Sequence, residues 1–332
     1  MNPLYATALG LVNRTSTVNG QPFDPLTPVP TRRGTGDIVH YGVMVPGLPE
    51  PIRFLDVIVI LGTARAPIFG VSALLEGPAA DAAWLLTGSG VDADSFARLS
   101  VDRDCELAGD GAHMRFGKQL TVDRRGGRIA VRIDRPTLSA ELELAPTRAV
   151  SHFARIPGVY DHWSVLCRYA GQVRTDAETV DIAGLCTWEY ARAKNLPLPF
   201  RSFAYHVLTL DDSTQALVSE VLGPGGLPVL QAVYLRHVDG RASVHTRDFT
   251  HTVVEWAAHP LTTPDGHEMR MPHTVAWSVQ DDDGAPLLDV SVIANGDFTY
   301  GLGAGYAGSC RFTGTYRGRP VEGTSYLEWI TR

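Results

Sequence analysis

Polar and apolar residues alternate most clearly between residues 171 and 240. Short alternating segments are separated there by Gly, Pro and Asp, which is typical of strands joined by turns. Further turn signals at 264–266 and 281–284 extend this pattern toward the end of the chain. The pattern predicts a mainly β protein, built as antiparallel barrels or sandwiches.

The same alternation begins earlier, at Ile38, and predicts strands over 38–45, 127–133 and 138–144. A run of apolar residues at 52–61 is predicted to be a buried strand, because its centre is β-branched. The segments 81–86 and 92–99 are expected to form helical turns. We therefore expect few helices, confined mainly to the first half of the chain.

Turn and proline positions suggest three parts. Residues 1–34 are predicted to be a lead-in, with a helix over 1–19 followed by an extended segment that contains four prolines. Residues 35–160 form the first predicted β domain. Residues 161–332 form the second, because Pro157 and Gly158 interrupt the pattern and a new set of strands begins at Val165.

Charge and cysteine usage exclude several classes of function. The 36 acidic and 29 basic residues give a net charge of −7, which argues against nucleic acid and anionic membranes as partners. The strongest apolar run, 52–62, is short and contains two charges, so stable membrane insertion is not expected. Four widely spaced cysteines and no recognisable signal peptide predict reduced thiols and a cytoplasmic location.

A carboxylate flanked by two aromatic residues, Trp188-Glu189-Tyr190, lies on one of the predicted strands. Side chains alternate along a strand, so Trp188 and Tyr190 share one face and Glu189 lies on the other. If Glu189 faces an apolar interior, desolvation would raise its pKa and allow it to act as a general acid. The alternative is a surface glutamate paired with Arg192.

A second polar cluster is Tyr160-Asp161-His162-Trp163. Asp161 and His162 are candidates for a pair that handles a proton. The alternative is a connecting turn in which Asp161 caps a backbone N–H group.

Isolated polar residues also lie on otherwise apolar strand faces, as in a pocket with a few convergent polar groups. They are His206, Glu220, His251 and His273, the last on the same face as Trp277. Taken singly, such a residue is more often a satisfied core residue or lies at the mouth of a barrel, whereas together they favour a pocket. The histidines lack a recognisable metal-ligand spacing, and no phosphate-binding or nucleophile motif is present, so neither a metal nor a cofactor is implied.

Three segments, 171–192, 205–240 and 321–329, together resemble the carotenoid 1,2-hydratase and AttH-like family. This resemblance implies two lipocalin-like antiparallel β-barrel domains with a few short helices. In those hydratases an Asp-His pair helps to protonate an alkene, and the matching positions here are Glu189 and Tyr190. Thr187 replaces a tyrosine of the family, and His162-Trp163 match an upstream His-Trp pair.

The leading hypothesis is an enzyme that acts on a hydrophobic small molecule, isoprenoid or polyketide-like, by hydration, isomerisation or cyclisation. Glu189 is the expected acid, and Asp161 and His162 are the expected relay or water-positioning groups. An apolar cavity at the junction of the two domains is expected to hold the substrate. The residues expected to line it are Trp163, Trp188, Tyr190, His206 and Trp277. The alternative from another class is a carrier of a hydrophobic ligand, which needs a cavity but no buried acid.

Overall fold

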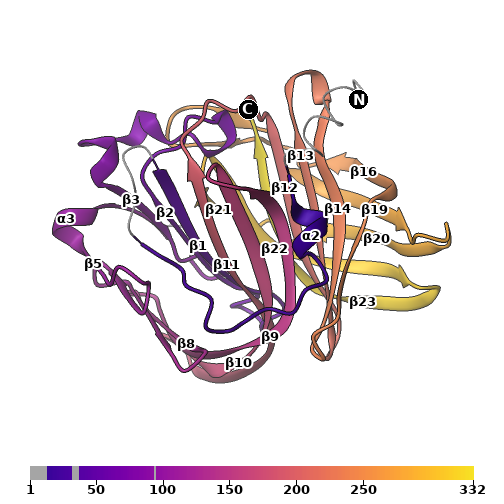
Figure 1. Ribbon diagram of the computed structural model, residues 1–332, viewed down its shortest axis with the longest axis horizontal. Coiled ribbons are helices and arrows are strands. Elements are labelled where there is room, and N and C mark those ends of the chain that lie inside the picture. The colour runs from indigo at the N-terminus through magenta and orange to yellow at the C-terminus, as the bar shows by residue number, and fades with distance from the viewer. Residues whose placement is uncertain (1–12, 32–36, 93–94) are drawn as a thin grey trace.

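The computed structural model describes residues 13–31, 37–92 and 95–332 of the chain. Strands make up 62% of it and helices 6%, well above the usual 20–25% strand content of globular proteins. Two large antiparallel sheets are each curled into a barrel-like unit, and they lie side by side (Figure 1). The predicted fold class, two antiparallel β-barrel domains with few short helices, is confirmed.

The first sheet contains eleven strands in the order β4-β3-β2-β1-β11-β10-β9-β8-β7-β6-β5. Its two edge strands, β4 and β5, follow each other in the chain, so the sheet curls until its ends approach. The strands are β1 (Asp37–Val45), β2 (Leu55–Leu61), β3 (Ala82–Leu86), β4 (Phe96–Ser100), β5 (Cys105–Leu107), β6 (His113–Phe116), β7 (Leu120–Arg125), β8 (Arg128–Asp134), β9 (Leu138–Ile156), β10 (Tyr160–Thr175) and β11 (Thr179–Lys194).

The second sheet has the order β15-β14-β13-β12-β23-β22-β20-β19-β16, with β21 paired to β22. Its strands are β12 (Ser202–Asp211), β13 (Thr214–Leu222), β14 (Pro228–His237), β15 (Ala242–His245), β16 (Arg247–Trp256), β19 (Pro272–Gln280), β20 (Pro286–Ala294), β21 (Thr299–Leu302), β22 (Gly305–Tyr316) and β23 (Arg319–Thr331). A separate small hairpin is formed by β17 (Leu261–Thr262) and β18 (Glu268–Met269).

Helices in the described part of the chain are single turns. They are α2 (Thr15–Val18), η1 (Pro67–Phe69), η2 (Ser72–Leu74), η3 (Ala79–Asp81), α3 (Val101–Asp104) and η4 (Pro224–Gly226). Most of the helix predicted over 1–19 lies outside the described residues. Among the residues that are described, no helix has the length and apolar character needed to cross a membrane.

The prediction of helical turns at 81–86 and 92–99 is wrong for most of these residues. The apolar residues Ala82–Leu86 form β3, which is buried along its whole length, and Phe96–Ser100 form β4 beside it. Local sequence suggested turns there, but pairing with the neighbouring strand β2 satisfies the backbone and buries the side chains.

The division between the sheets falls between Lys194 and Ser202. The long strands β10 and β11 lie in the sequence that was assigned to the second domain, yet both pair within the first sheet. Pro157 and Gly158 form the turn that joins β9 to β10. This proline-glycine signal therefore marks a hairpin within the first sheet.

Alternation along the strands produces two separate cores. On β1, Tyr41 and Val43 point into the first barrel and join the apolar cluster that fills it. Met44 points the other way, and its cluster also contains residues of the second sheet such as Val207 and Leu217. The first sheet therefore buries both of its faces over β1, β2, β10 and β11, and the outer face packs against the second sheet.

Candidate functional site

Strand β11 divides the aromatic residues from the carboxylate. Trp188 and Tyr190 point into the first barrel, where their rings contact that of Tyr41. Glu189 points to the opposite face and is only 3% exposed. Its hydrogen-bond partner there is Tyr205 of β12, so Glu189 lies between the two sheets. The alternative of a surface glutamate paired with Arg192 is wrong, because Arg192 binds Asp37 instead.

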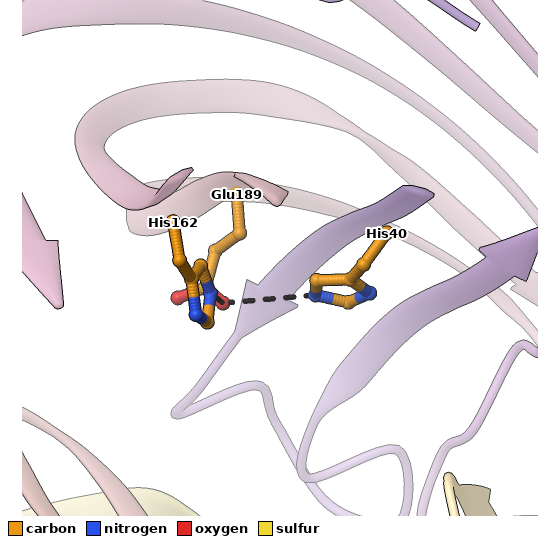
Figure 2. Close-up of side chains that lie close together, drawn as sticks. All are labelled: His40, His162 and Glu189. Atoms are coloured by element: carbon orange, nitrogen blue, oxygen red, sulfur yellow. Dashed lines mark ion pairs between the residues drawn. The ribbon is translucent and has the colours of Figure 1, made fainter. Parts of the chain in front are cut away.

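The strand register brings two histidines to Glu189. Gly42 of β1 and Ser164 of β10 lie directly across from Glu189 on its two neighbouring strands. His40 and His162 each precede those residues by two positions, so they share the same face. The Nε2 atoms of His162 and His40 lie 3.7 and 3.9 Å from Glu189 Oε2. Figure 2 shows the three side chains directed toward one another.

The remaining polar atoms of these three side chains are already bonded. Tyr205 donates its hydroxyl to Glu189 Oε1 at 2.5 Å. His40 Nδ1 lies 3.0 Å from the carbonyl oxygen of Val59, and His162 Nδ1 lies 3.0 Å from the hydroxyl of Tyr160. A carbonyl oxygen can only accept, so His40 carries a proton on Nδ1. The atoms left over, two Nε2 and one Oε2, are the ones that converge.

Burial and the histidines act on Glu189 in opposite directions. Burial raises its pKa, but His162 and His40 outweigh burial and hold the pKa of Glu189 well below its usual value. For His162, burial is the largest influence and lowers its pKa, while Glu189 opposes that change. Glu189 is therefore an ionised carboxylate, contrary to the sequence-based expectation of a raised pKa.

The surroundings of this site combine aromatic rings with one buried cation. Phe153 packs edge-on against His162 at 4.7 Å between ring centroids, and also against Tyr205 and Tyr234. Arg236 is fully buried nearby, donates a hydrogen bond to Ser164 Oγ at 2.8 Å and interacts electrostatically with Glu189. The site is thus largely apolar, with its charge concentrated at Glu189 and Arg236.

A second group of acids lies on the same interface. Asp56 of β2 accepts a hydrogen bond from the Tyr326 hydroxyl at 2.9 Å, and that hydroxyl is 3.0 Å from Glu328 Oε1. Burial raises the pKa of Asp56 to about 6 and raises the pKa of Glu328 well above its usual value. One hydroxyl proton cannot serve both carboxyl groups fully, so this group holds at least one additional proton.

The structure separates the other predicted site residues from Glu189. Asp161 lies on the opposite face of β10 from His162 and pairs with Arg155 at 2.5 Å. Trp163 is part of the core inside the first barrel. His206 and Trp277 lie within the second barrel, where His206 Nε2 is 2.8 Å from Ser325 Oγ. Of the other predicted residues, His162 alone lies beside the Glu189 carboxylate.

Two pockets open at one end of the first barrel. The larger has a volume of about 550 Å³ and is lined by residues that include Tyr160, Asp161 and Lys194. The smaller, about 440 Å³, is bordered by Trp163 and Tyr190. Tyr160 connects the larger pocket with the Glu189 site, because its hydroxyl contacts His162. Both pockets have charged residues in their walls, unlike the apolar junction cavity expected from the sequence.

Sequence reasoning missed His40 and Tyr205. The signal for His40 was present: it is a polar residue in the alternating segment 38–45, on the face of Gly42. Tyr205 was only part of a block of paired strands. Neither could be assigned to Glu189, because the pairing of β1 with β11 and the packing of β12 on the first sheet join distant segments.

Several solved structures share this fold, and three of them illustrate the likeness. The AttH-like protein NE1406 of Nitrosomonas europaea is 12% identical, with a TM-score of 0.63 over 90% of this chain and 94% of that one. Kievitone hydratase of Nectria haematococca is 10% identical, with a TM-score of 0.55 over 94% of this chain and 98% of that one. CghA in its structure with Sch210972 is 8% identical, with a TM-score of 0.55 over 94% and 97%.

These likenesses confirm the resemblance to the AttH-like and hydratase group at the level of fold. Among curated protein sequences, none matches this chain. One family model, described as a family of unknown function (DUF6670), matches residues 58–332, which is most of the chain. The chain therefore belongs to the DUF6670 family.

Proposed function

We propose that this protein is an enzyme that acts on an apolar small molecule by acid–base chemistry at the Glu189 site. The observation that carries this proposal is the buried Glu189 carboxylate, with the Nε2 atoms of His40 and His162 directed at its free oxygen. A charged group inside an apolar interface costs stability unless it is compensated, and such arrangements concentrate at functional sites.

The ionised state of Glu189 changes the role that the sequence suggested for it. A carboxylate cannot donate a proton, so the proton is exchanged by a group held between Glu189 Oε2 and the two imidazoles. Glu189 then provides the negative charge that fixes this group and favours its protonated form. Asp161 has no part in this proposal, because it lies on the other face of β10.

Hydration illustrates how the site would operate. A proton adds to one carbon of an alkene, and the cation that forms on the other carbon is captured by water. That water then loses its proton to the site, which returns to its starting state. The Phe153 ring packs against His162, and the rings of Tyr205 and Tyr234 pack against Phe153; these electron-rich rings would stabilise the cation. In cyclisation, a second double bond of the substrate captures the cation in place of water, and the new ring cation then loses a proton to the site.

The named structural relatives support this class of reaction. One is a hydratase by name, and another was solved with the small molecule Sch210972. An isoprenoid or polyketide-like substrate fits the apolar interface, where Phe153 and Met44 are buried. A cytoplasmic location is part of the same proposal and rests on the four free cysteines, because unpaired thiols are typical of a reducing compartment.

The test begins with small molecules that co-purify with the protein, identified by native mass spectrometry. Each is then incubated with the wild-type protein and with Glu189→Gln in H₂¹⁸O. Hydration adds the mass of labelled water, whereas cyclisation changes retention without a change in mass. We expect conversion by the wild type only. If the wild type binds the molecule and returns it unchanged, the protein is a carrier and not an enzyme.

A further inference from the structure

The three side chains of the Glu189 site share one feature. Each has one polar atom hydrogen-bonded to a neighbouring residue and another directed at a common point. The directed atoms are His40 Nε2, His162 Nε2 and Glu189 Oε2, and all lie within 4.8 Å of one another. The atoms bonded to the fold contact Val59, Tyr160 and Tyr205. Each candidate ligand is therefore held in its orientation by a hydrogen bond from its other polar atom.

The Nδ1 contact of His40 determines which of its ring nitrogens is available. His40 Nδ1 donates to a carbonyl oxygen, so Nε2 is the ring nitrogen left to bind a ligand. Glu189 Oε2 lies 3.9 Å from it, beyond hydrogen-bond distance. His162 Nε2 is buried and has no hydrogen-bond partner. The gap between these three atoms leaves room for a cation that all of them could bind.

We propose that His40, His162 and Glu189 bind one divalent transition-metal ion, of which Zn²⁺ is the best match. Two imidazoles and one carboxylate, with a fourth position open to water, form a common catalytic zinc site. Metal-binding histidines almost always donate their other N–H group to a carbonyl, a carboxylate or water. His40 meets that description through Val59, and the Tyr160 hydroxyl provides a comparable support for His162.

The distances allow an ion to fit. In a tetrahedral zinc site with bonds of about 2.0–2.2 Å, neighbouring ligand atoms lie roughly 3.4 Å apart. The two observed distances to Glu189 Oε2, 3.7 and 3.9 Å, require closure by a few tenths of an ångström, and the two Nε2 atoms lie within 4.8 Å of each other. Gly42 leaves the space open, since a Cβ atom there would lie 3.2 Å from His40 Nε2 and 3.3 Å from the Cβ of Glu189.

This inference concerns the same site as the proposed function, and it identifies the group that exchanges the proton. A zinc-bound water has a pKa of about 7 and would supply the proton or the hydroxide. Metal binding itself is measured without any substrate. The two proposals can therefore fail separately.

The test uses the full-length protein after treatment with a chelator. Zn²⁺ is added back, and binding is followed by calorimetry and by elemental analysis of the desalted protein. We expect one ion per chain. His40→Gln and His162→Gln should each weaken Zn²⁺ binding by more than about 100-fold, and Tyr160→Phe by about 10-fold, as for the loss of a supporting hydrogen bond. Co²⁺ should give the visible absorption of a four-coordinate site.

A matched control is His113→Gln. His113 also lies beside two carboxylates, 2.8 Å from Asp123 and 3.9 Å from Glu106, but its side chain is 43% exposed and no second histidine of the described residues joins the group. Its replacement should leave Zn²⁺ binding unchanged. Gly42→Ala adds a methyl group beside the site and tests the position of the metal without removing a ligand. Circular dichroism confirms that each variant is folded.

Two results would overturn the inference. One is a folded wild-type protein that binds no Zn²⁺ or Co²⁺, and the other is binding that His40→Gln and His162→Gln leave unchanged. If the protein binds no metal but converts its substrate, and Glu189→Gln does not, the proposed function stands and the metal inference fails. If Zn²⁺ binds and Glu189→Gln still converts substrate normally, the proposed function fails instead.

Discussion

The second barrel and the interface between the two sheets each contain a buried glutamate beside histidine, and the hydrogen bonds of the two glutamates differ. In the second barrel, Glu220 Oε2 lies 2.5 Å from His251 Nδ1, and Gln231 donates to the other oxygen at 2.7 Å. The His251 ring also stacks on Trp277 at 3.9 Å. Between the sheets, Glu189 has one oxygen bonded to Tyr205, while the other has two imidazoles at 3.7 and 3.9 Å.

Burial does not distinguish these pairs, because the side chains of Glu220 and Glu189 are 7% and 4% exposed. The difference lies in which polar atoms already have a hydrogen-bond partner within the protein. Both oxygens of Glu220 have protein partners at hydrogen-bond distance, so that pair stabilises the second barrel. Nε2 of His162 has no hydrogen-bond partner, and the two imidazoles at Oε2 of Glu189 lie at 3.7 and 3.9 Å, beyond hydrogen-bond distance, so these atoms remain available to a proton, a water or an ion.

The largest expected effect on stability comes from Glu220→Ala. Removing one partner of a buried pair leaves His251 and Gln231 without their acceptor, so the free energy of unfolding should fall by about 3–5 kcal/mol. Chemical denaturation measures this change. Glu255→Ala is the control, because Glu255 pairs with His273 at the surface and should contribute less than about 1 kcal/mol. Equal losses in both variants would contradict the structural role of Glu220.

The acids beside the Glu189 site should produce a pH-dependent stability. The folded-state pKa of Asp56, about 6, exceeds its ordinary value of 3.8, mainly through burial and against the opposing hydrogen bond from Tyr326. Between these values the folded state binds more protons than the unfolded state. The free energy of unfolding should therefore fall as pH rises from about 4 to about 6, by up to about 3 kcal/mol for this residue.

Asp56→Asn isolates this contribution. Asparagine retains an acceptor for the Gly88 amide and a polar group for Tyr326, but it does not titrate. The difference in unfolding free energy between wild type and Asp56→Asn should change across the window from pH 4 to pH 6 and level off on either side. Asp289, which is exposed on β20, provides the matched Asp→Asn control. A difference that stays constant with pH would show that Asp56 does not titrate in this range.

A smaller effect is expected for Tyr205→Phe. It removes the donor to Glu189 Oε1, and a hydrogen bond to a charged group contributes about 1.5–3 kcal/mol. Tyr306→Phe removes a hydrogen bond to the neutral carbonyl oxygen of Thr262 and should cost about 1 kcal/mol. Thermal or denaturant unfolding measures both. A larger loss in Tyr306→Phe than in Tyr205→Phe would argue against a charged Glu189.

Much of the fold could be predicted from the sequence, because alternation along a strand is a local property. The segments 38–45 and 52–61 became β1 and β2, and the alternation at Trp188-Glu189-Tyr190 correctly separated the carboxylate from the aromatic rings. The hairpin at Pro157 and Gly158 was mistaken for a boundary, because a tight turn and a linker use the same residues.

Only part of the Glu189 site could be predicted from the sequence, because some of its residues come from distant segments. His162 and Glu189 lie on paired neighbouring strands joined by a short turn, so they were both within reach of sequence reasoning. His40 reaches Glu189 only because β1 pairs with β11, almost 150 residues later, and Tyr205 only because the two sheets pack together. Trp277 and His206 lie in the second barrel, apart from Glu189, and their sequence could not show this because nothing local indicates which barrel a strand face lines.

The most direct test compares Glu189→Gln with Glu220→Gln for conversion of the identified small molecule. Both substitutions keep the shape of the side chain and remove its charge. The account predicts that Glu189→Gln remains folded and binds the molecule but converts it at least about 100-fold more slowly, the low end for acid–base catalysis. Glu220→Gln should keep a rate close to the wild type per folded molecule. Near-normal conversion by Glu189→Gln would contradict the central claim that the open Glu189 site is the catalytic one.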